Sequence, residues 1–185
     1  MSVILIRHGM TAGNREGRYI GCRTDEPLSP TGAEALKTRV YPAASRLYVS
    51  PLRRCLETAR LIYPDLTPVE IADFRECDFG AFEGKNYAEL QSDPRYQAWI
   101  DSGGALPFPD GESRADFARR CVRAFSALPD LWRQDTALIA HGGTLMAIMA
   151  AYALPRREYF DYQVKNGNGF ILEQDGRWEE IRAFA

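Results

Sequence analysis

The chain contains two histidines, and each stands after a short apolar run and directly before a glycine. His8 follows residues 3–6 and Arg7, and His141 follows residues 137–140. A short, continuously apolar run is typical of a strand buried on both faces of a sheet. Ligands of open α/β sheets bind just beyond the carboxyl ends of such strands. Both histidines are therefore expected at one crevice, where the following glycines let the backbone approach a ligand closely.

The residues around His8 suit an anion. Arg7 adjoins it, and Thr11 and Asn14 supply short polar side chains in the next turn. Arg54 falls in the first turn of a helix expected after the apolar run 47–49. A helix start offers free backbone N–H groups, and a guanidinium pairs with phosphate oxygens through two hydrogen bonds. The combination predicts a pocket for a phosphoryl group.

This pocket predicts covalent phosphoryl transfer through His8. Neighbouring cations disfavour a protonated imidazole, so His8 should stay neutral near pH 7 and act as a nucleophile. Such chemistry depends mostly on positioning and charge stabilisation, so we expect no metal and no cofactor. A leaving alkoxide needs a proton, and Glu76 is the candidate acid because burial among apolar neighbours would raise its pKa. From the residues alone, three other acids compete with it: Asp73, Asp78 and Glu83.

Strand and helix patterns alternate along the chain. Ser29-Pro30 and Ser50-Pro51 each place a cap residue before a proline expected at the first helical position. Ser113 and Asp116 resemble a capping box, and residues 145–154 form a further helical pattern. Near the end, Asp175-Gly176 separates two apolar runs, which indicates a tight hairpin.

The predicted fold is an α/β three-layer sandwich. Its sheet is expected to be mixed and mostly parallel, with an antiparallel edge hairpin and helices on both faces. At 185 residues the chain is expected to form a single domain, residues 1–185. Residues 73–112 interrupt the alternation with scattered aromatic, proline and glycine residues, and we interpret them as a lid-like insertion. The alternative is a surface excursion with its own aromatic cluster.

Composition narrows the partners and the compartment. The net charge is −2 and the isoelectric point about 5.8, so the sequence has no basic field for nucleic acid or for a membrane surface. Four cysteines without a Cys-x-x-Cys pair suggest a reduced protein. Four apolar residues near the start are too few for a signal segment. We therefore expect a cytoplasmic protein that binds a small phosphorylated metabolite.

Four motifs resemble those of the histidine phosphatase superfamily, which includes cofactor-dependent phosphoglycerate mutases and many small phosphatases. They are Arg7-His8-Gly9 with Thr11 and Asn14, Ser50-Pro51-Leu52-Arg53-Arg54-Cys55 with Thr58, Glu76 with Phe79-Gly80 and Phe82-Glu83-Gly84, and His141-Gly142-Gly143. One departure is Met10, where the family usually has a polar residue. The resemblance implies an α/β sandwich with a mixed sheet.

The resemblance also implies a role for each matching residue. His8 would be phosphorylated, and Glu76 would be the proton donor. The phosphoryl oxygens would be held by the side chains of Arg7, Arg54 and His141, with assistance from Asn14 and the Gly142 backbone.

Within the superfamily, the short chain favours a phosphatase over the longer mutases. Residues 18–28 and 109–113 are similar to the α-ribazole phosphatase group, and in the first stretch we expect Gly21 and Cys22 at the substrate site. The substrate would then be α-ribazole 5′-phosphate, with Tyr87, Trp99 and Phe108 stacked on an aromatic leaving group.

Three alternatives remain open. The first is a phosphoglycerate mutase or fructose-2,6-bisphosphatase-like activity, which shares the first chemical step. The second is an inactive binding protein on the same fold, although both histidines, both arginines and the acid are present. The third is a metal enzyme using two histidines and a carboxylate, against which the cationic Arg7 and Arg54 argue.

Overall fold

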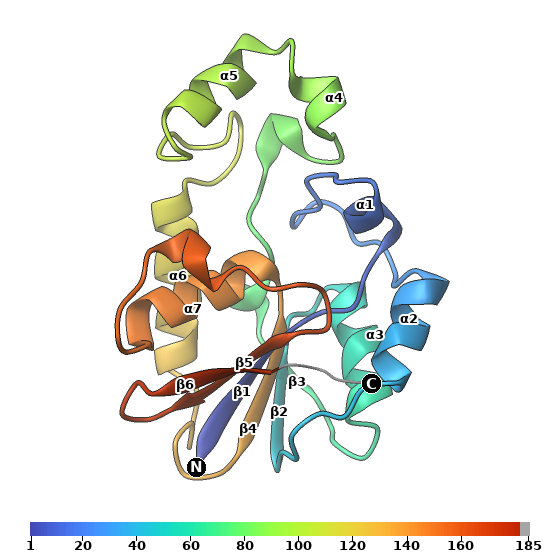
Figure 1. Ribbon diagram of the computed structural model, residues 1–185, viewed down its shortest axis with the longest axis vertical. Coiled ribbons are helices and arrows are strands. Elements are labelled where there is room, and N and C mark those ends of the chain that lie inside the picture. The colour runs from blue at the N-terminus through green and yellow to red at the C-terminus, as the bar shows by residue number, and fades with distance from the viewer. Residues whose placement is uncertain (182–185) are drawn as a thin grey trace.

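A six-stranded mixed sheet runs through the protein in the computed structural model, which describes residues 1–181 (Figure 1). Its strand order is β3-β2-β4-β1-β5-β6. The strands are β1 (Ser2–Arg7), β2 (Arg46–Val49), β3 (Val69–Glu70), β4 (Thr136–Ala140), β5 (Gly169–Glu173) and β6 (Trp178–Ile181). The pairs among β3, β2, β4 and β1 are parallel, whereas β5 pairs antiparallel with both β1 and β6. The predicted mixed, mostly parallel sheet with an antiparallel edge hairpin is confirmed.

The central strands are buried because both of their faces are apolar. Residues 3–6 of β1 and all of β4 are inaccessible or nearly so. Helices α2 (Pro30–Lys37) and α3 (Arg53–Ile62) cover one face, where Cys55 and Ala59 pack against Ile4 and Ile6. Helices α6 (Arg114–Ser126) and α7 (Gly142–Tyr152) cover the other (Figure 1). The expected helices on both faces are confirmed.

Two of the predicted helix boundaries are wrong. Ser29 caps α2 as expected, but α3 begins at Arg53, after Leu52, and Pro51 is not its first residue. The Ser50 hydroxyl instead lies 2.8 Å from His141 Nε2. Helix α7 begins at Gly142 rather than Leu145 and ends at Tyr152, because its backbone hydrogen bonds start directly after His141.

The hairpin between β5 and β6 turns at Asp175-Gly176, as the sequence predicts. Gly176 has a φ of +87°, which a residue without a Cβ adopts freely. Its N–H donates to the Glu173 carbonyl at 3.0 Å, and the Glu173 N–H donates to Arg177 O at 2.8 Å.

Residues 73–112 extend beyond the carboxyl ends of the strands, beside the short helix α1 (Ala12–Arg15) (Figure 1). Here the chain forms the 3₁₀ turns η1 (Ala72–Phe74) and η2 (Gly80–Phe82) and the helices α4 (Tyr87–Leu90) and α5 (Pro94–Asp101). A third 3₁₀ turn, η3 (Tyr159–Tyr162), follows α7. Residues 73–112 have their own aromatic cluster, built around Phe82, Tyr96 and Phe108, which packs on α6 and α7. Within residues 1–181, no helix is both long and apolar enough to cross a membrane.

Candidate active site

The two histidines meet because the strands that precede them are neighbours. Arg7 of β1 pairs with Ala140 of β4, so His8 and His141 leave the sheet side by side. Their ring centroids are 5.2 Å apart, and the ring planes are inclined by 66°. The two histidines therefore lie together at the carboxyl ends of β1 and β4, as the sequence predicts.

His8 is held in the tautomer that a nucleophile needs. Its Nδ1 lies 2.7 Å from the Gly9 carbonyl oxygen. A carbonyl only accepts, so Nδ1 carries the proton and Nε2 keeps its lone pair. The side chain is buried, and burial lowers its pKa well below the ordinary value, with the cations of Arg54 and Arg7 adding to the effect. The imidazole is thus neutral at pH 7.

His141 is the N-cap residue of α7 and is fully buried. Its Nε2 is 2.8 Å from the Ser50 hydroxyl at the end of β2. Burial lowers the pKa of His141 well below its usual value, and the Arg54 guanidinium lowers it further. Three adjacent strands, β2, β4 and β1, therefore each deliver one polar side chain to the same place.

Arg54 is fully buried and Arg7 is half-buried, and both have donor capacity left over. Arg54 donates to the carbonyl oxygens of Thr24 at 2.7 Å and Gly21 at 3.0 Å, and Arg7 donates to Val164 O at 2.7 Å. The Nε of each is buried without a hydrogen-bond partner among residues 1–181. An unpaired buried donor costs about 1–3 kcal/mol. Two such donors beside a neutral histidine form a natural receptor for phosphoryl oxygens.

Glu76 is buried, with 8% of its surface exposed, and its carboxyl group interacts with the charges of Arg54 and Arg7. Its Oε1 accepts from Cys77 N–H at 2.9 Å, and its Oε2 accepts from Gly143 N–H at 3.4 Å. Burial raises its pKa, although the Cys77 N–H and the Arg54 and Arg7 cations oppose the rise. Gly143 makes this approach possible, because a Cβ there would lie 2.5 Å from Glu76 Oε1.

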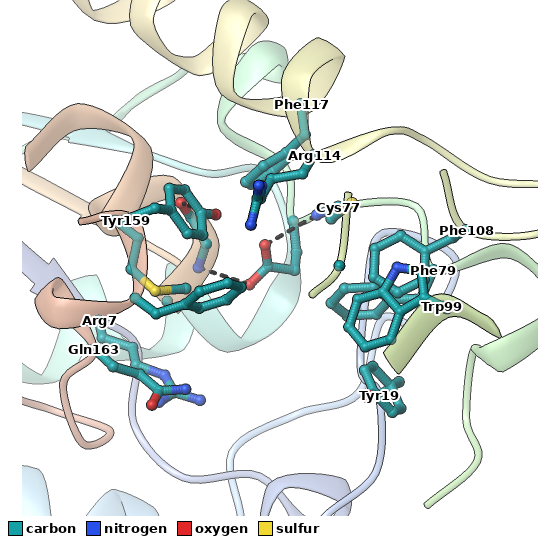
Figure 2. A pocket seen from close by; sticks show the side chains of 16 residues that line it. Arg7, Tyr19, Cys77, Phe79, Trp99, Phe108, Arg114, Phe117, Tyr159 and Gln163 are labelled. Atoms are coloured by element: carbon teal, nitrogen blue, oxygen red, sulfur yellow. Dashed lines mark hydrogen bonds between the residues drawn. The ribbon is translucent and has the colours of Figure 1, made fainter. Parts of the chain in front are cut away.

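A cavity of about 300 Å³ adjoins Arg7 and Glu76. Figure 2 shows Tyr19, Phe79, Trp99 and Phe108 gathered on one side, and Arg7, Arg114, Tyr159 and Gln163 facing them. Glu76 and Gly142 also line the cavity. His8, His141 and Arg54 do not line it, since they are buried.

The aromatic residues that line the cavity differ in one position from those expected to stack on the leaving group. Trp99 and Phe108 line the cavity, and their rings stack on each other with the centroids 4.9 Å apart. Tyr87 lies elsewhere: it is 66% exposed and contacts the edge of Tyr96. The α4 helix starts at Tyr87 and directs it away from the cavity, so the predicted stacking role of Tyr87 is wrong.

The other predicted binding residues surround the site without lining the cavity. Asn14 Oδ1 accepts from Thr11 N–H at 3.3 Å. Gly21 supports Arg54 through its carbonyl, and the Cys22 N–H donates to Cys77 O at 3.1 Å. Burial raises the pKa of the Cys22 thiol, and Asp78 adds to the rise. Direct substrate contacts by these residues stay predictions.

Sequence reasoning missed several residues that shape the site. Asn166 Nδ2 donates to His8 O at 3.1 Å and to Asn14 Oδ1 at 3.0 Å, which ties the loop after β1 to the turn before β5. Thr58, which belongs to the second motif but has no role implied by it, accepts from Gly9 N–H through its Oγ1 at 2.9 Å. The polar, glycine-rich turn 165–169 before β5 was the available signal for Asn166. Arg114, Tyr159 and Gln163 had no such signal, because only tertiary packing brings them to the cavity.

Comparison with known proteins agrees with this site. The model of the histidine phosphatase superfamily (branch 1) matches residues 3–185. An adenosylcobalamin/alpha-ribazole phosphatase of Escherichia coli is 30% identical over 193 residues, covering 98% of this chain and 94% of that protein. A 2,3-bisphosphoglycerate-dependent phosphoglycerate mutase of Gloeobacter violaceus is 32% identical over 162 residues, covering 80% and 73%.

A solved structure shares the whole architecture. The alpha-ribazole phosphatase from Shigella flexneri superposes with a TM-score of 0.82 at 26% identity, covering 100% of this chain and 96% of that one. The predicted fold class and the predicted activity class, phosphoric monoester hydrolysis, both agree with these similarities. The chain therefore belongs to the histidine phosphatase superfamily.

Proposed function

We propose that the protein hydrolyses a small phosphomonoester through a phosphohistidine on His8 Nε2, without a metal. One observation carries the proposal. A neutral imidazole, protonated on Nδ1, lies near two arginines whose buried Nε donors have no partner among residues 1–181. Such donors are suited to bind the oxygens of a phosphoryl group.

The reaction follows from the positions of these groups. His8 Nε2 attacks phosphorus, a P–N bond forms and the P–O ester bond breaks while Glu76 gives its proton to the leaving oxygen. The Glu76 carboxylate then takes a proton from water, which attacks phosphorus and breaks the P–N bond. Free phosphate leaves, and His8 and Glu76 return to their starting states.

The surrounding residues stabilise the charge that develops on phosphorus. Arg7 and Arg54 bind its oxygens, with His141, Asn14 and the Gly142 N–H assisting. The Gly142 N–H belongs to the first turn of α7, where backbone donors are free and the helix dipole favours an anion.

The proposal extends to the architecture. Residues 73–112 act as a lid within a single domain, and they contribute Phe79, Trp99 and Phe108 to the lining of the cavity. The protein acts in the cytoplasm, a proposal supported by its four free cysteines, which suit a reducing compartment.

The favoured substrate is α-ribazole 5′-phosphate. The relatives from Escherichia coli and Shigella flexneri act on α-ribazole compounds by name, and the aromatic rings of Trp99 and Phe108 line the cavity that would take a heterocyclic leaving group. Phosphoglycerate mutase activity is the second candidate, favoured by the relative from Gloeobacter violaceus. A mutase would pass the phosphoryl group to a substrate hydroxyl instead of water.

A substrate panel with wild type and His8→Ala tests the proposal. Chelator is present throughout, and the panel holds α-ribazole 5′-phosphate, 3-phosphoglycerate with and without 2,3-bisphosphoglycerate, fructose 2,6-bisphosphate and an aryl phosphate. Phosphate release that disappears in His8→Ala supports the mechanism. Isomerised phosphoglycerate without phosphate release identifies a mutase. No reaction with any member refutes the proposed function.

A further inference from the structure

Arg120 of α6 binds the backbone that leads into Glu76 and the Glu76 carbonyl itself. Its Nη1 donates to the carbonyl oxygens of Asp73 at 2.7 Å and Arg75 at 2.8 Å, and its Nη2 donates to Glu76 O at 3.0 Å. A guanidinium is planar, so these carbonyl oxygens are fixed relative to one another. One side chain therefore sets the path of the chain through the candidate acid.

Glu112 completes this arrangement from the far end of the 73–112 segment. Its two carboxylate oxygens accept from Arg120 Nε at 2.7 Å and Nη2 at 2.8 Å, a bidentate pair. Glu112 Oε2 also accepts from Asp78 N–H at 3.0 Å, and the Glu112 N–H donates to Asp78 O at 2.9 Å. The backbone is thus held two residues after Glu76 as well as at Glu76 itself.

The pair works from outside the cavity. Neither Arg120 nor Glu112 lines it, and the Arg120 side chain is 18% exposed. The Arg120 guanidinium lies 4.8 Å from the centroid of the Phe117 ring, which does line the cavity. The pair can therefore act on the reaction only through residues that do line the cavity, among them Glu76, whose backbone it binds directly, and Phe117.

We propose that Arg120 and Glu112 form a positioning pair that fixes the Glu76 carboxyl at the distance and orientation needed to protonate the leaving group. The inference rests on the proposed function, in which Glu76 is the general acid. It also gives a purpose to Glu112 in the Pro109-Asp110-Gly111-Glu112-Ser113 stretch, for which the sequence offered none. A displacement of about 1 Å at a reacting group can lower a rate about 100-fold.

The test compares kcat/KM for two leaving groups. The value of kcat/KM reports every step up to loss of the leaving group. Comparing two leaving groups therefore shows how much the rate depends on the proton from Glu76. An alkoxide needs that proton, whereas 4-nitrophenolate leaves without it. In Arg120→Met, we expect kcat/KM for an alkyl phosphate to fall about 10- to 100-fold, and kcat/KM for 4-nitrophenyl phosphate to change less than about threefold. A general structural defect would lower both equally.

Two further variants sharpen the result. Arg123→Met is the matched control, since Arg123 sits one turn later on α6 and pairs at 3.2 Å with the exposed Asp73 carboxylate rather than with backbone near Glu76. We expect it to leave both kcat/KM values unchanged. Glu112→Gln keeps an acceptor for Arg120 and is the milder change if Arg120→Met unfolds. It should show the same leaving-group selectivity, and Arg120→Met/Glu112→Gln should lose no more than Arg120→Met alone.

Glu76→Gln separates failure of this inference from failure of the proposed function. If Glu76→Gln lowers both kcat/KM values equally, the acid assignment itself is wrong. A fall of kcat/KM in Glu76→Gln for the alkyl phosphate alone supports the acid assignment. If folded Arg120→Met and Glu112→Gln then lower both kcat/KM values equally, or change neither value, the positioning pair is refuted and the proposed function stands.

Discussion

Gly143→Ala should separate activity from stability in a single substitution. The new Cβ would lie 2.5 Å from Glu76 Oε1, where ordinary contact begins at 3.4 Å, and 2.8 Å from Phe117 Cε1. The carboxyl must therefore retreat by nearly 1 Å. A retreat of that size corresponds to about 100-fold in rate, or about 2.7 kcal/mol of transition-state stabilisation.

Stability should respond differently. Gly143 lies in the first turn of α7, and alanine is a better helix former than glycine by about 0.5–1 kcal/mol. This gain offsets part of the unfavourable free energy of the close contact between the new Cβ and the Phe117 ring. Overpacking typically costs about 1–3 kcal/mol, so we expect the free energy of unfolding to fall by no more than about 2.5 kcal/mol while the rate falls about 100-fold.

The assay combines urea unfolding with kcat/KM for an alkyl phosphate. Gly143→Ala and Glu76→Gln should each lower kcat/KM, and the double variant should lose little more than Glu76→Gln alone, because both changes act through one carboxyl. Full alkyl phosphatase activity in a folded Gly143→Ala would refute the role given to the contact between Gly143 and Glu76.

Three further outcomes are expected. Burial lowers the pKa of His8 and His141 in the folded state, so below pH ~6.5 the unfolded chain binds more protons than the folded one. As the pH falls through this range, the free energy of unfolding should drop by up to about 1.4 kcal/mol per pH unit for each histidine. A free energy of unfolding in urea that does not change with pH there would contradict the burial of neutral histidines. Trp99→Leu should raise KM for an aromatic phosphate and spare a small alkyl phosphate, whereas Tyr87→Ala, outside the cavity, should change neither; equal KM values in Trp99→Leu and wild type would exclude stacking. Exhaustive chelation should leave phosphatase activity intact, and activity restored only by added metal would overturn the metal-free mechanism.

Proline-based helix signals illustrate how far the sequence reaches. Ser29-Pro30 starts α2 as expected, and Asp93-Pro94 starts α5 by the same rule, although the irregular composition of residues 73–112 concealed it. Ser50-Pro51 carries the same signal and starts no helix. The difference is tertiary: the Ser50 hydroxyl faces His141 from a neighbouring strand, a contact that no local pattern contains.

The short elements escaped prediction for a related reason. Strand β3 has only two residues, Val69 and Glu70, and both are exposed, so it has no apolar run to reveal it. Its backbone pairing with β2 is what defines it.

By itself the sequence determined the chemistry-bearing groups and the sheet that presents them, because buried strands need continuous apolar runs and His8 and His141 follow two of them directly. Only the tertiary structure decided how those groups are tuned. The Nδ1 contact of His8, the unpaired Nε donors of Arg7 and Arg54, and the support of Glu76 by Arg120 all depend on distances between segments far apart in the chain. Local residue patterns do not encode such distances, since they arise when the two helical layers and the 73–112 segment pack around the sheet.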